Sequence, residues 1–303
     1  MSTLFTGISE LRTVSERGTL NDAAIIAQSG TIAWVGPASE APAADEKVDL
    51  GGRAVLPGWV DSHTHMVFDG DRSAEFEARI SGGSYEAGGI AVTMDATRQA
   101  GTDRLDKLVA DRVAAGRRGG TTTFETKTGY GLNTESEVEA AKVASRHVDD
   151  VTFLGAHLVP PGADAEDYLD EVVGPMLEGV APYVQWIDVF CERGAFNEEQ
   201  SRRVLEAGKK LGLGLRVHGN QLGEGPGVAL AVELGAASVD HVNHLSDEDV
   251  ELLANSDTVA TMLPACDLST REPLAPGRTL LDAGATLALS LIHISEPTRL
   301  RRI

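Results

Sequence analysis

Short apolar runs alternate with longer polar segments of helical period from Ala54 to about Ser290. Eight of these runs are typical of buried strands, because they are short, apolar and bounded by turn residues. They are AVLPGWVDSHTH, TTTFETK, VTFLGAH, WIDVFCE, LGLRVHGN, SVDHV, TVATMLP and TLALS. A strand and then a helix, repeated eight times, predicts an α/β fold with a parallel (β/α)8 TIM-like barrel over residues 54–290. A doubly wound open sheet would give a similar pattern.

Several of the intervening segments begin with residues that cap helices. Thr134 is followed three residues later by Glu137, and Asn197 by Gln200, which is the capping-box spacing. Ser246 stands before DEDVELLAN as a further N-cap candidate. We therefore expect helices to begin at these points.

Residues 1–53 have a different pattern, with short β-branched runs interrupted by Gly, Pro, Asn and Asp. The segment AAIIAQSGTIAWVG contains a Ser-Gly turn between two strand-like halves. A small N-terminal β-sandwich subdomain is expected there.

Charge and composition narrow the class of partner. The 303 residues carry a formal net charge of -20, which would repel nucleic acids and anionic membranes. The chain has neither an apolar run long enough to cross a bilayer nor a signal-peptide pattern. Cys191 and Cys266 lie in strand-like segments, so a disulfide framework is not expected. We expect a cytoplasmic protein that binds a small molecule.

Ionisable residues gather at the C-terminal ends of the predicted strands. They are His63, His65, Lys127, His157, Glu192, His218 and His241. In a barrel these ends converge on one mouth, where active sites lie. Histidines two apart at a strand end face the same side, and a third from another strand completes a hydrolytic metal site with an open position. A lone His-x-His pair could equally be structural.

Further candidates depend on that mouth. His157 and His241 are each as readily explained as buried polar residues, but within one mouth they can hold substrate or polarise a carbonyl. Tyr130 lies between two glycines, where a backbone can approach a ligand, although a glycine turn with an anchoring aromatic is the plainer interpretation. Arg72 is a guanidinium able to clamp a carboxylate, whereas most arginines are simply solvated.

The chain resembles the amidohydrolase superfamily and, within it, the imidazolonepropionases. The resemblance begins at LPGWVDSHTHMVFDGDR and continues in order through ETKTGYGL, FLGAHLVPP, DVFCE, HGNQL and DHV, over about residues 3–290. It implies hydrolysis of 4-imidazolone-5-propanoate to N-formimidoyl-L-glutamate in histidine degradation, by a homodimer. A related cyclic amidase or deaminase is the alternative, favoured if Arg72 and Tyr130 face away from the metal.

The resemblance also implies a role for each candidate residue. His63, His65 and His218 match the ligands of one Zn²⁺ or Fe³⁺ ion per chain. The matches to substrate-binding positions are Arg72, Tyr85, Tyr130 and His157, and the matches to catalytic positions are Gln221, beside the ring, and His241, at the reacting carbonyl.

The last residues depart from the family pattern. The resemblance implies a metal-binding aspartate near position 292, where this chain has Ile292. The stretch SLIHISEPTRLRRI lacks periodicity, so we expect residues 291–303 to be a non-native tail on a truncated chain. Truncation would leave the barrel and the β subdomain incomplete, which predicts weak metal retention, poor solubility and, in the extreme, an inactive fragment.

Overall fold

The structure is a computed structural model that describes residues 1–71 and 91–290. Arg72, Tyr85, Ile292 and the expected tail at 291–303 lie outside the described residues. The chain divides into two units, Met1–Trp59 and Val60–Ile303, and each is considered by itself.

The N-terminal unit is a four-stranded sheet in the order β3-β2-β1-β4. Its strands are β1 (Ser2–Arg12), β2 (Thr19–Gln28), β3 (Thr31–Pro37) and β4 (Glu46–Val55), with a 3₁₀ turn at Ala38–Glu40. The predicted hairpin is confirmed, because β2 and β3 pair in antiparallel fashion across Ser29 and Gly30. Both turn residues have positive φ, 51° and 77°, as the tight hairpin turn that matches strand twist requires.

The second sheet has eight strands within the described residues, in the order β12-β11-β10-β9-β8-β7-β6-β5. They are β5 (Trp59–Asp61), β6 (Thr121–Lys127), β7 (Asp150–Ala156), β8 (Trp186–Cys191), β9 (Gly214–Gly219), β10 (Ser238–His241), β11 (Val259–Met262) and β12 (Leu287–Leu289). All eight predicted strands are confirmed. Each strand neighbours the next one in sequence, which is the order of a barrel, whereas a doubly wound sheet reverses its order partway.

The two ends of this sheet meet at Ser290. Its hydroxyl donates to Asp61 Oδ1 (3.0 Å) and lies 2.7 Å from the carbonyl oxygen of His63. The residue after the last strand therefore contacts the first strand and the histidine that follows it, and the barrel is nearly closed.

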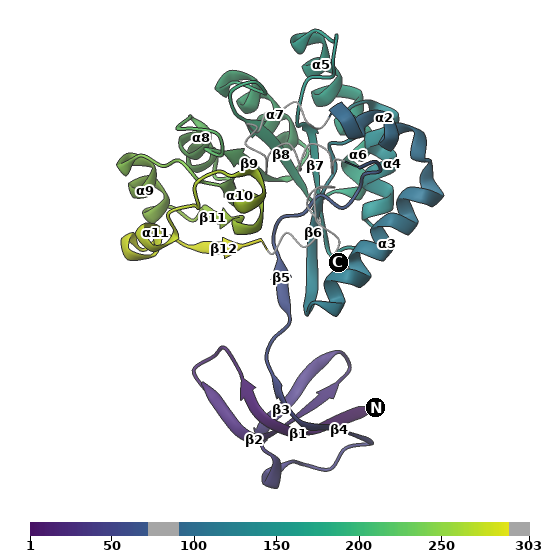
Figure 1. Ribbon diagram of the computed structural model, residues 1–303, viewed down its shortest axis with the longest axis vertical. Helices are drawn as coiled ribbons and strands as arrows, with labels where there is room; N and C mark the ends of the chain where they lie inside the picture. Colours follow the sequence, from purple (N-terminus) through teal and green to yellow (C-terminus); the bar gives the residue numbers. More distant parts are fainter. Residues whose placement is uncertain (72–90, 291–303) are drawn as a thin grey trace. The chain divides into compact units, whose positions relative to one another are not determined.

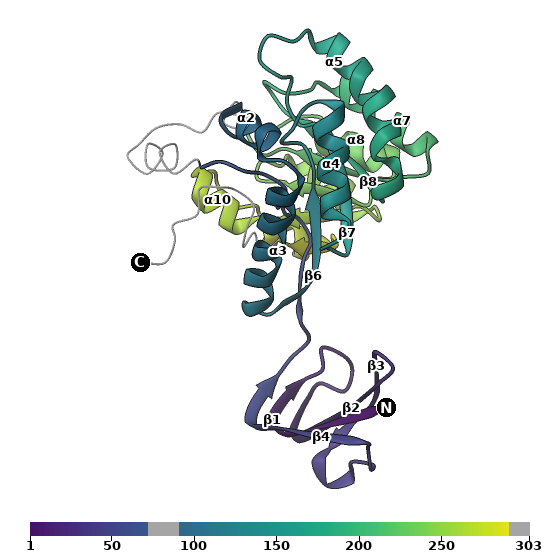
Figure 2. The same ribbon diagram turned by 90° about the vertical axis from the view of Figure 1, so that its right-hand side faces the viewer.

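Helices flank the strands, as Figures 1 and 2 show for the second unit. They are α2 (Ala91–Ala100), α3 (Thr102–Arg118), α4 (Thr134–Ala144), α5 (Ala165–Glu171), α6 (Leu177–Val180), α7 (Glu198–Lys210), α8 (Gly227–Leu234), α9 (Asp247–Ala254), α10 (Pro264–Thr270) and α11 (Gly277–Ala283). A π-helical segment, Val172–Met176, precedes α6, and a 3₁₀ turn, Ala181–Tyr183, follows it. None of the helices in the described part of the chain has the length and apolarity to span a membrane.

The capping predictions are confirmed at two helices and wrong at a third. Asn197 and Ser246 form the capping boxes of α7 and α9. At α4 the cap is Asn133, whose side chain accepts from the backbone N–H of Ser136 at 2.8 Å. Thr134 is already inside the helix, and the side chain of Glu137 accepts hydrogen bonds from the preceding loop.

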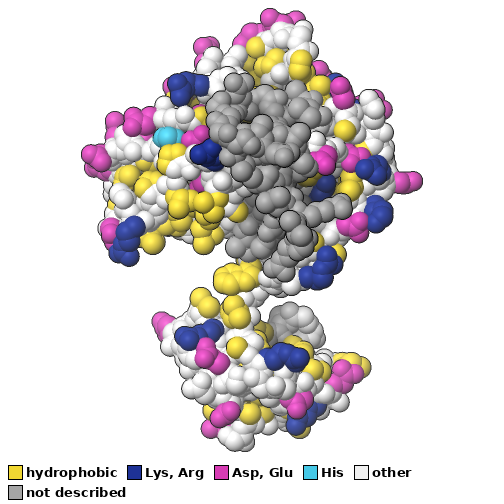
Figure 3. Space-filling view, in the orientation of Figure 1, with side chains coloured by type: hydrophobic (Ala, Val, Ile, Leu, Met, Phe, Trp, Pro, Cys, Tyr) yellow, Lys and Arg dark blue, Asp and Glu magenta, His cyan; other side chains and the backbone are white. Residues whose placement is uncertain are grey.

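The core of the second unit lies between the sheet and the helices around it. On β8, Ile187 is fully buried, and on α7, Val204 and Leu205 are as well. Close approach of α7 to β8 requires a glycine, since a Cβ on Gly208 would stand 2.3 Å from Ile187 Cγ2. Acidic side chains are spread over the visible face of each unit in Figure 3, in keeping with the net charge of -20. The side chains of Cys191 and Cys266 are both buried.

Candidate metal centre

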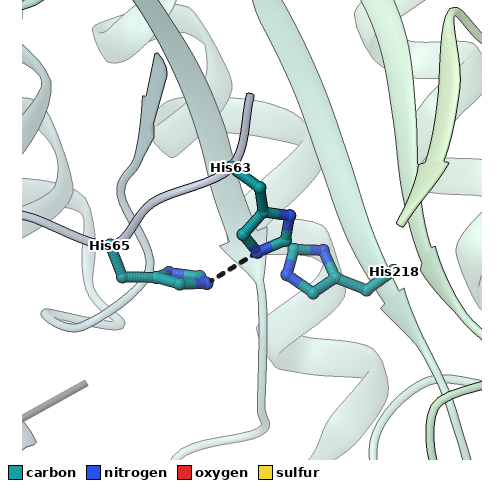
Figure 4. A group of neighbouring side chains, drawn as sticks. All are labelled: His63, His65 and His218. Atoms are coloured by element: carbon teal, nitrogen blue, oxygen red, sulfur yellow. Dashed lines mark hydrogen bonds between the residues drawn. The ribbon is translucent and has the colours of Figure 1, made fainter. Parts of the chain in front are cut away.

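Three histidines meet at the C-terminal ends of the barrel strands. His63 and His65 follow β5, and His218 lies on β9, the fifth strand of the barrel. Their ligand atoms all lie within 4.8 Å of one another, and all three side chains are buried. Figure 4 shows His65 and His218 approaching His63 from opposite sides. The structure thus brings together the three residues that the sequence suggested as ligands.

The ring nitrogens of this cluster fit a bound cation. His63 Nε2 and His65 Nε2 stand 3.2 Å apart, and His218 Nε2 has no hydrogen-bond partner among the described residues. Burial holds the pKa of both His63 and His65 well below the ordinary value, so these rings are neutral near pH 7. Neutral imidazole nitrogens facing one another suit a divalent metal that accepts their lone pairs.

Two buried aspartates hold the far sides of these rings. Asp240 Oδ2 lies 2.7 Å from His63 Nδ1, and Asp188 Oδ2 lies 3.0 Å from His218 Nδ1. The hydrogen bond from Asp240 favours the proton on Nδ1 of His63 and leaves its Nε2 for a metal, and the charge of Asp188 favours the same arrangement at His218. The sequence reasoning missed both aspartates. The available signal was a carboxylate inside each of the apolar strands WIDVFC and SVDH, because unpaired acidic residues are rarely buried.

Lys127, at the end of β6, is completely buried and lies next to the two aspartates. Its Nζ is 3.0 Å from Glu125 Oε1, 3.0 Å from Asp188 Oδ2 and 3.4 Å from Asp240 Oδ2. Burial alone would lower the pKa of Lys127, but the surrounding carboxylates raise it above the ordinary value. The residue is therefore a fixed positive charge.

His241, at the end of β10, lies beside the three histidines. Its ring centroid lies 5.4 Å from that of His63 and 5.3 Å from that of His218. The backbone of His241 has φ 84°, a conformation that is strained for any residue other than glycine. Such strain is found where a side chain must be aimed at a site. Burial lowers the pKa of His241 well below its ordinary value.

His157 and Tyr130 border the same centre. The His157 ring stacks at 12° on the His65 ring with centroids 5.4 Å apart, and Tyr130 lies 5.7 Å from each of these two rings. His157 Nδ1 pairs with the carbonyl oxygen of Gly129 at 2.9 Å, which fixes the orientation of the imidazole. Tyr130 thus faces the cluster. The alternative of a related amidase or deaminase would be favoured by a Tyr130 that faced away, so this contact does not favour it.

Gln221 is buried in the turn after β9, where its side-chain Nε2 lies 3.9 Å from Cys266 Sγ. Its backbone N–H donates to the carboxylate of Glu192, whose pKa is raised by burial. No hydrogen bond joins Gln221 to the three histidines among the described residues. Arg72 and Tyr85 lie outside the described residues.

The loop that carries Tyr130 is held by Glu137, a residue read from the sequence only as part of a helix cap. The buried Glu137 carboxylate accepts backbone N–H groups from Gly129 (2.7 Å), Gly131 (2.8 Å) and Leu132 (2.9 Å). One side chain therefore fixes the backbone on both sides of Tyr130.

A parallel barrel with a His-x-His pair after its first strand and a third histidine on its fifth defines a metal-dependent amidohydrolase. Solved structures with this fold include a triazine hydrolase from Arthrobacter aurescens (TM-score 0.69, 17% identity, covering 98% of this chain and 73% of that one). A zinc-bound adenosine deaminase from Xanthomonas campestris is similar as well (TM-score 0.65, 16% identity, 98% and 70% covered). At these identities the likeness shows the fold alone.

Sequence relatives identify the branch of the class. The imidazolonepropionase of Arthrobacter sp. (strain FB24) is 64% identical over 301 residues, which cover 96% of this chain and 75% of the relative. That of Streptomyces coelicolor is 53% identical over 298 residues, 95% of this chain and 76% of the relative. No protein-family model matches the chain. At this identity and coverage, the chain belongs to the imidazolonepropionase family.

Proposed function

We propose that this chain hydrolyses 4-imidazolone-5-propanoate to N-formimidoyl-L-glutamate. In this reaction water adds its hydroxyl to the lactam carbonyl carbon and a proton to the ring nitrogen, while the carbon–nitrogen bond between them breaks. The observation that carries the proposal is the cluster of three buried histidines at the barrel mouth. The substrate is inferred from the imidazolonepropionase relatives, such as the one that is 64% identical to this chain.

We infer that His63, His65 and His218 hold one zinc or iron ion through imidazole nitrogens. Such an ion, when bound, supplies a Lewis acid and lowers the pKa of water toward neutrality. The protein contributes the orientation of the rings: Asp240 and Asp188 hold His63 and His218 in the tautomer that binds metal. Imidazole ligands suit both metals.

The remaining candidates orient the substrate. His241, aimed by its strained backbone at the His63 and His218 rings, is placed to stabilise charge on the reacting carbonyl oxygen. Tyr130 and His157 supply aromatic surface beside His65 for the planar ring. Arg72 and Tyr85 are proposed to bind the propionate and Gln221 the ring edge, by family resemblance.

The test is turnover of the purified chain with Zn²⁺ or Fe²⁺ in excess, followed by the loss of imidazolone absorbance and by mass detection of the product. We expect product from the unmodified chain and loss of at least about a hundredfold in His218→Ala, since a ligand is removed. His147→Ala is the matched control, because His147 pairs with Asp106 (3.0 Å), away from the cluster. A folded, metal-replete chain that forms no product, or equal rates in both variants, would refute the proposal.

A further inference from the structure

The charged cluster beneath the histidines joins two metal ligands that lie on different strands. We propose that Lys127 is a positioning residue: it sets the relative orientation of His63 and His218 by holding Asp240 and Asp188 at once. The inference rests on the proposed function, because it assumes that these histidines bind metal.

The contacts form one continuous path. Asp188 Oδ2 lies 3.0 Å from His218 Nδ1 and also 3.0 Å from Lys127 Nζ. Asp240 Oδ2 lies 2.7 Å from His63 Nδ1 and 3.4 Å from the same Nζ. In each aspartate it is the oxygen facing the histidine that also faces the lysine. Any shift of Nζ is therefore passed to both imidazoles.

Charge explains why a cation is required there. Glu125, Asp188 and Asp240 are all buried, and each comes within 3.4 Å of Lys127 Nζ. Without the lysine, the carboxylates would repel one another in a region that water does not solvate. Arg216, 3.2 Å from Glu125, compensates that carboxylate and has no ion pair with Asp188 or Asp240 among the described residues. Lys127 is thus the cation shared by the two aspartates.

The two aspartates are not held equally firmly by the backbone. Asp188 Oδ1 also accepts the backbone N–H groups of Val189 (2.7 Å) and His218 (3.1 Å), so strands β8 and β9 hold it in place. No backbone N–H in the described residues donates to Asp240. Loss of the lysine should therefore disturb His63 more than His218.

The competing explanation is a cluster that only braces the barrel. A brace affects unfolding, whereas a positioning residue also changes the metal site in the folded chain. Metal affinity and metal spectroscopy separate the two, because neither depends on substrate or turnover.

The experiment measures Zn²⁺ affinity of the full chain by chelator competition, and the visible absorption spectrum after Co²⁺ loading. For Lys127→Met we expect a loss of Zn²⁺ affinity of about 10–100-fold and an altered Co²⁺ spectrum. Leu205→Ala is the control, because it opens a cavity at α7, an element that carries no residue of the cluster, and is expected to weaken folding by a comparable amount. Its affinity and spectrum should match those of the unmodified chain.

A second set of variants serves if Lys127→Met does not fold. In Lys127→Met with Glu125→Gln, one positive and one negative charge are removed together, so the net charge of the cluster is unchanged. Asp188→Asn and Asp240→Asn should each weaken Zn²⁺ binding, the latter more. Their combined effect should be non-additive by at least about threefold with Lys127 present and additive in the charge-balanced background.

Affinity and spectrum of the folded lysine variants within about twofold of the unmodified chain would overturn the inference, as would additive aspartate effects when Lys127 is present. These outcomes leave the proposed reaction standing if the unmodified chain turns over. Conversely, Zn²⁺ binding that depends on Lys127 without any hydrolysis would refute the proposed reaction alone. Absence of both Zn²⁺ and iron binding by the unmodified chain would overturn both.

Discussion

Replacing Glu137 with glutamine should loosen the loop that carries Tyr130. Glu137 Oε1 accepts from Gly131 and Leu132, and Oε2 accepts from Gly129. An amide has nearly the same shape, and its oxygen can keep the first pair of bonds. Its NH₂ group then faces the N–H of Gly129, so a donor meets a donor where an ionised oxygen had accepted.

The size of the effect follows from the three bonds. Losing the bond to Gly129 costs about 1.5–3 kcal/mol, and replacing a charged by a neutral acceptor weakens the other two by about 0.5–1 kcal/mol each. The opposing term is burial, which raises the pKa of Glu137 and therefore makes a neutral amide easier to bury. If that term returns about 1–2 kcal/mol, the net loss of unfolding free energy is about 0.5–4 kcal/mol.

The loop also reaches the site, because the Gly129 carbonyl oxygen holds His157 Nδ1 at 2.9 Å. We expect Glu137→Gln to raise KM for the imidazolone about tenfold, a loss of about 1.4 kcal/mol of binding, with Zn²⁺ affinity unchanged. Urea unfolding, steady-state kinetics and chelator competition measure the three quantities.

Glu135→Gln is the matched control: it is the same substitution in the first turn of the same helix, at an exposed side chain. Any helix-dipole contribution is therefore similar in both variants. Should Glu137→Gln prove as stable as Glu135→Gln and show the same KM, the assignment of Glu137 to the Tyr130 loop would be wrong.

Two further predictions concern stability. Gly208→Ala should lower the unfolding free energy by about 1–3 kcal/mol, because the new Cβ would stand 2.3 Å from Ile187 Cγ2. This loss exceeds the gain from the better helix propensity of alanine. Adding Ile187→Ala should recover part of the loss, as measured by urea unfolding. Burial raises the pKa of Asp267 to about 6 from its ordinary 3.8. As pH rises, the unfolded chain therefore loses this proton before the folded chain does. The unfolding free energy should fall by roughly 2–3 kcal/mol between about pH 4 and pH 6. Asp267→Asn should remove this pH dependence of stability. If the unfolding midpoints of the two proteins change in parallel across this pH range, the prediction is wrong.

The barrel was predictable because its signal is local and repeated. TTTFETK coincides with β6 from Thr121 to Lys127, and WIDVFCE with β8 to within one residue. The strand-end histidines were predictable for a related reason, since a barrel brings all C-terminal strand ends to one side. The strand register was not needed to group His63, His65 and His218.

The supports of the site were not predictable in this way. Asn and Thr are both residue types that favour the N-cap position, and Glu137 lies four residues after Asn133 and three after Thr134. Local spacing favoured Thr134 and a capping box, whereas the loop before α4 offered Glu137 three backbone donors that only the folded chain brings together. Tertiary hydrogen bonding overrode the sequence pattern.

The aspartates illustrate the same limit across strands. Asp240 is paired in register with His218, yet its carboxylate contacts His63, and Asp188 on β8 contacts His218 on β9. Which histidine each aspartate serves depends on register and twist, which strand periodicity leaves open.

A buried group of opposite charges is a poor device for stability alone. Apolar side chains of similar volume in such positions are often neutral or stabilising, because desolvation cancels most of the attraction. The cluster around Lys127 places a carboxylate at Nδ1 of two histidines on separate elements, which apolar side chains cannot do. Among the described residues, Asp188 accepts backbone N–H groups and Asp240 does not, so we expect the cation to matter most at His63, which follows a strand only three residues long. Orientation of the proposed metal ligands therefore explains this cluster better than stability does.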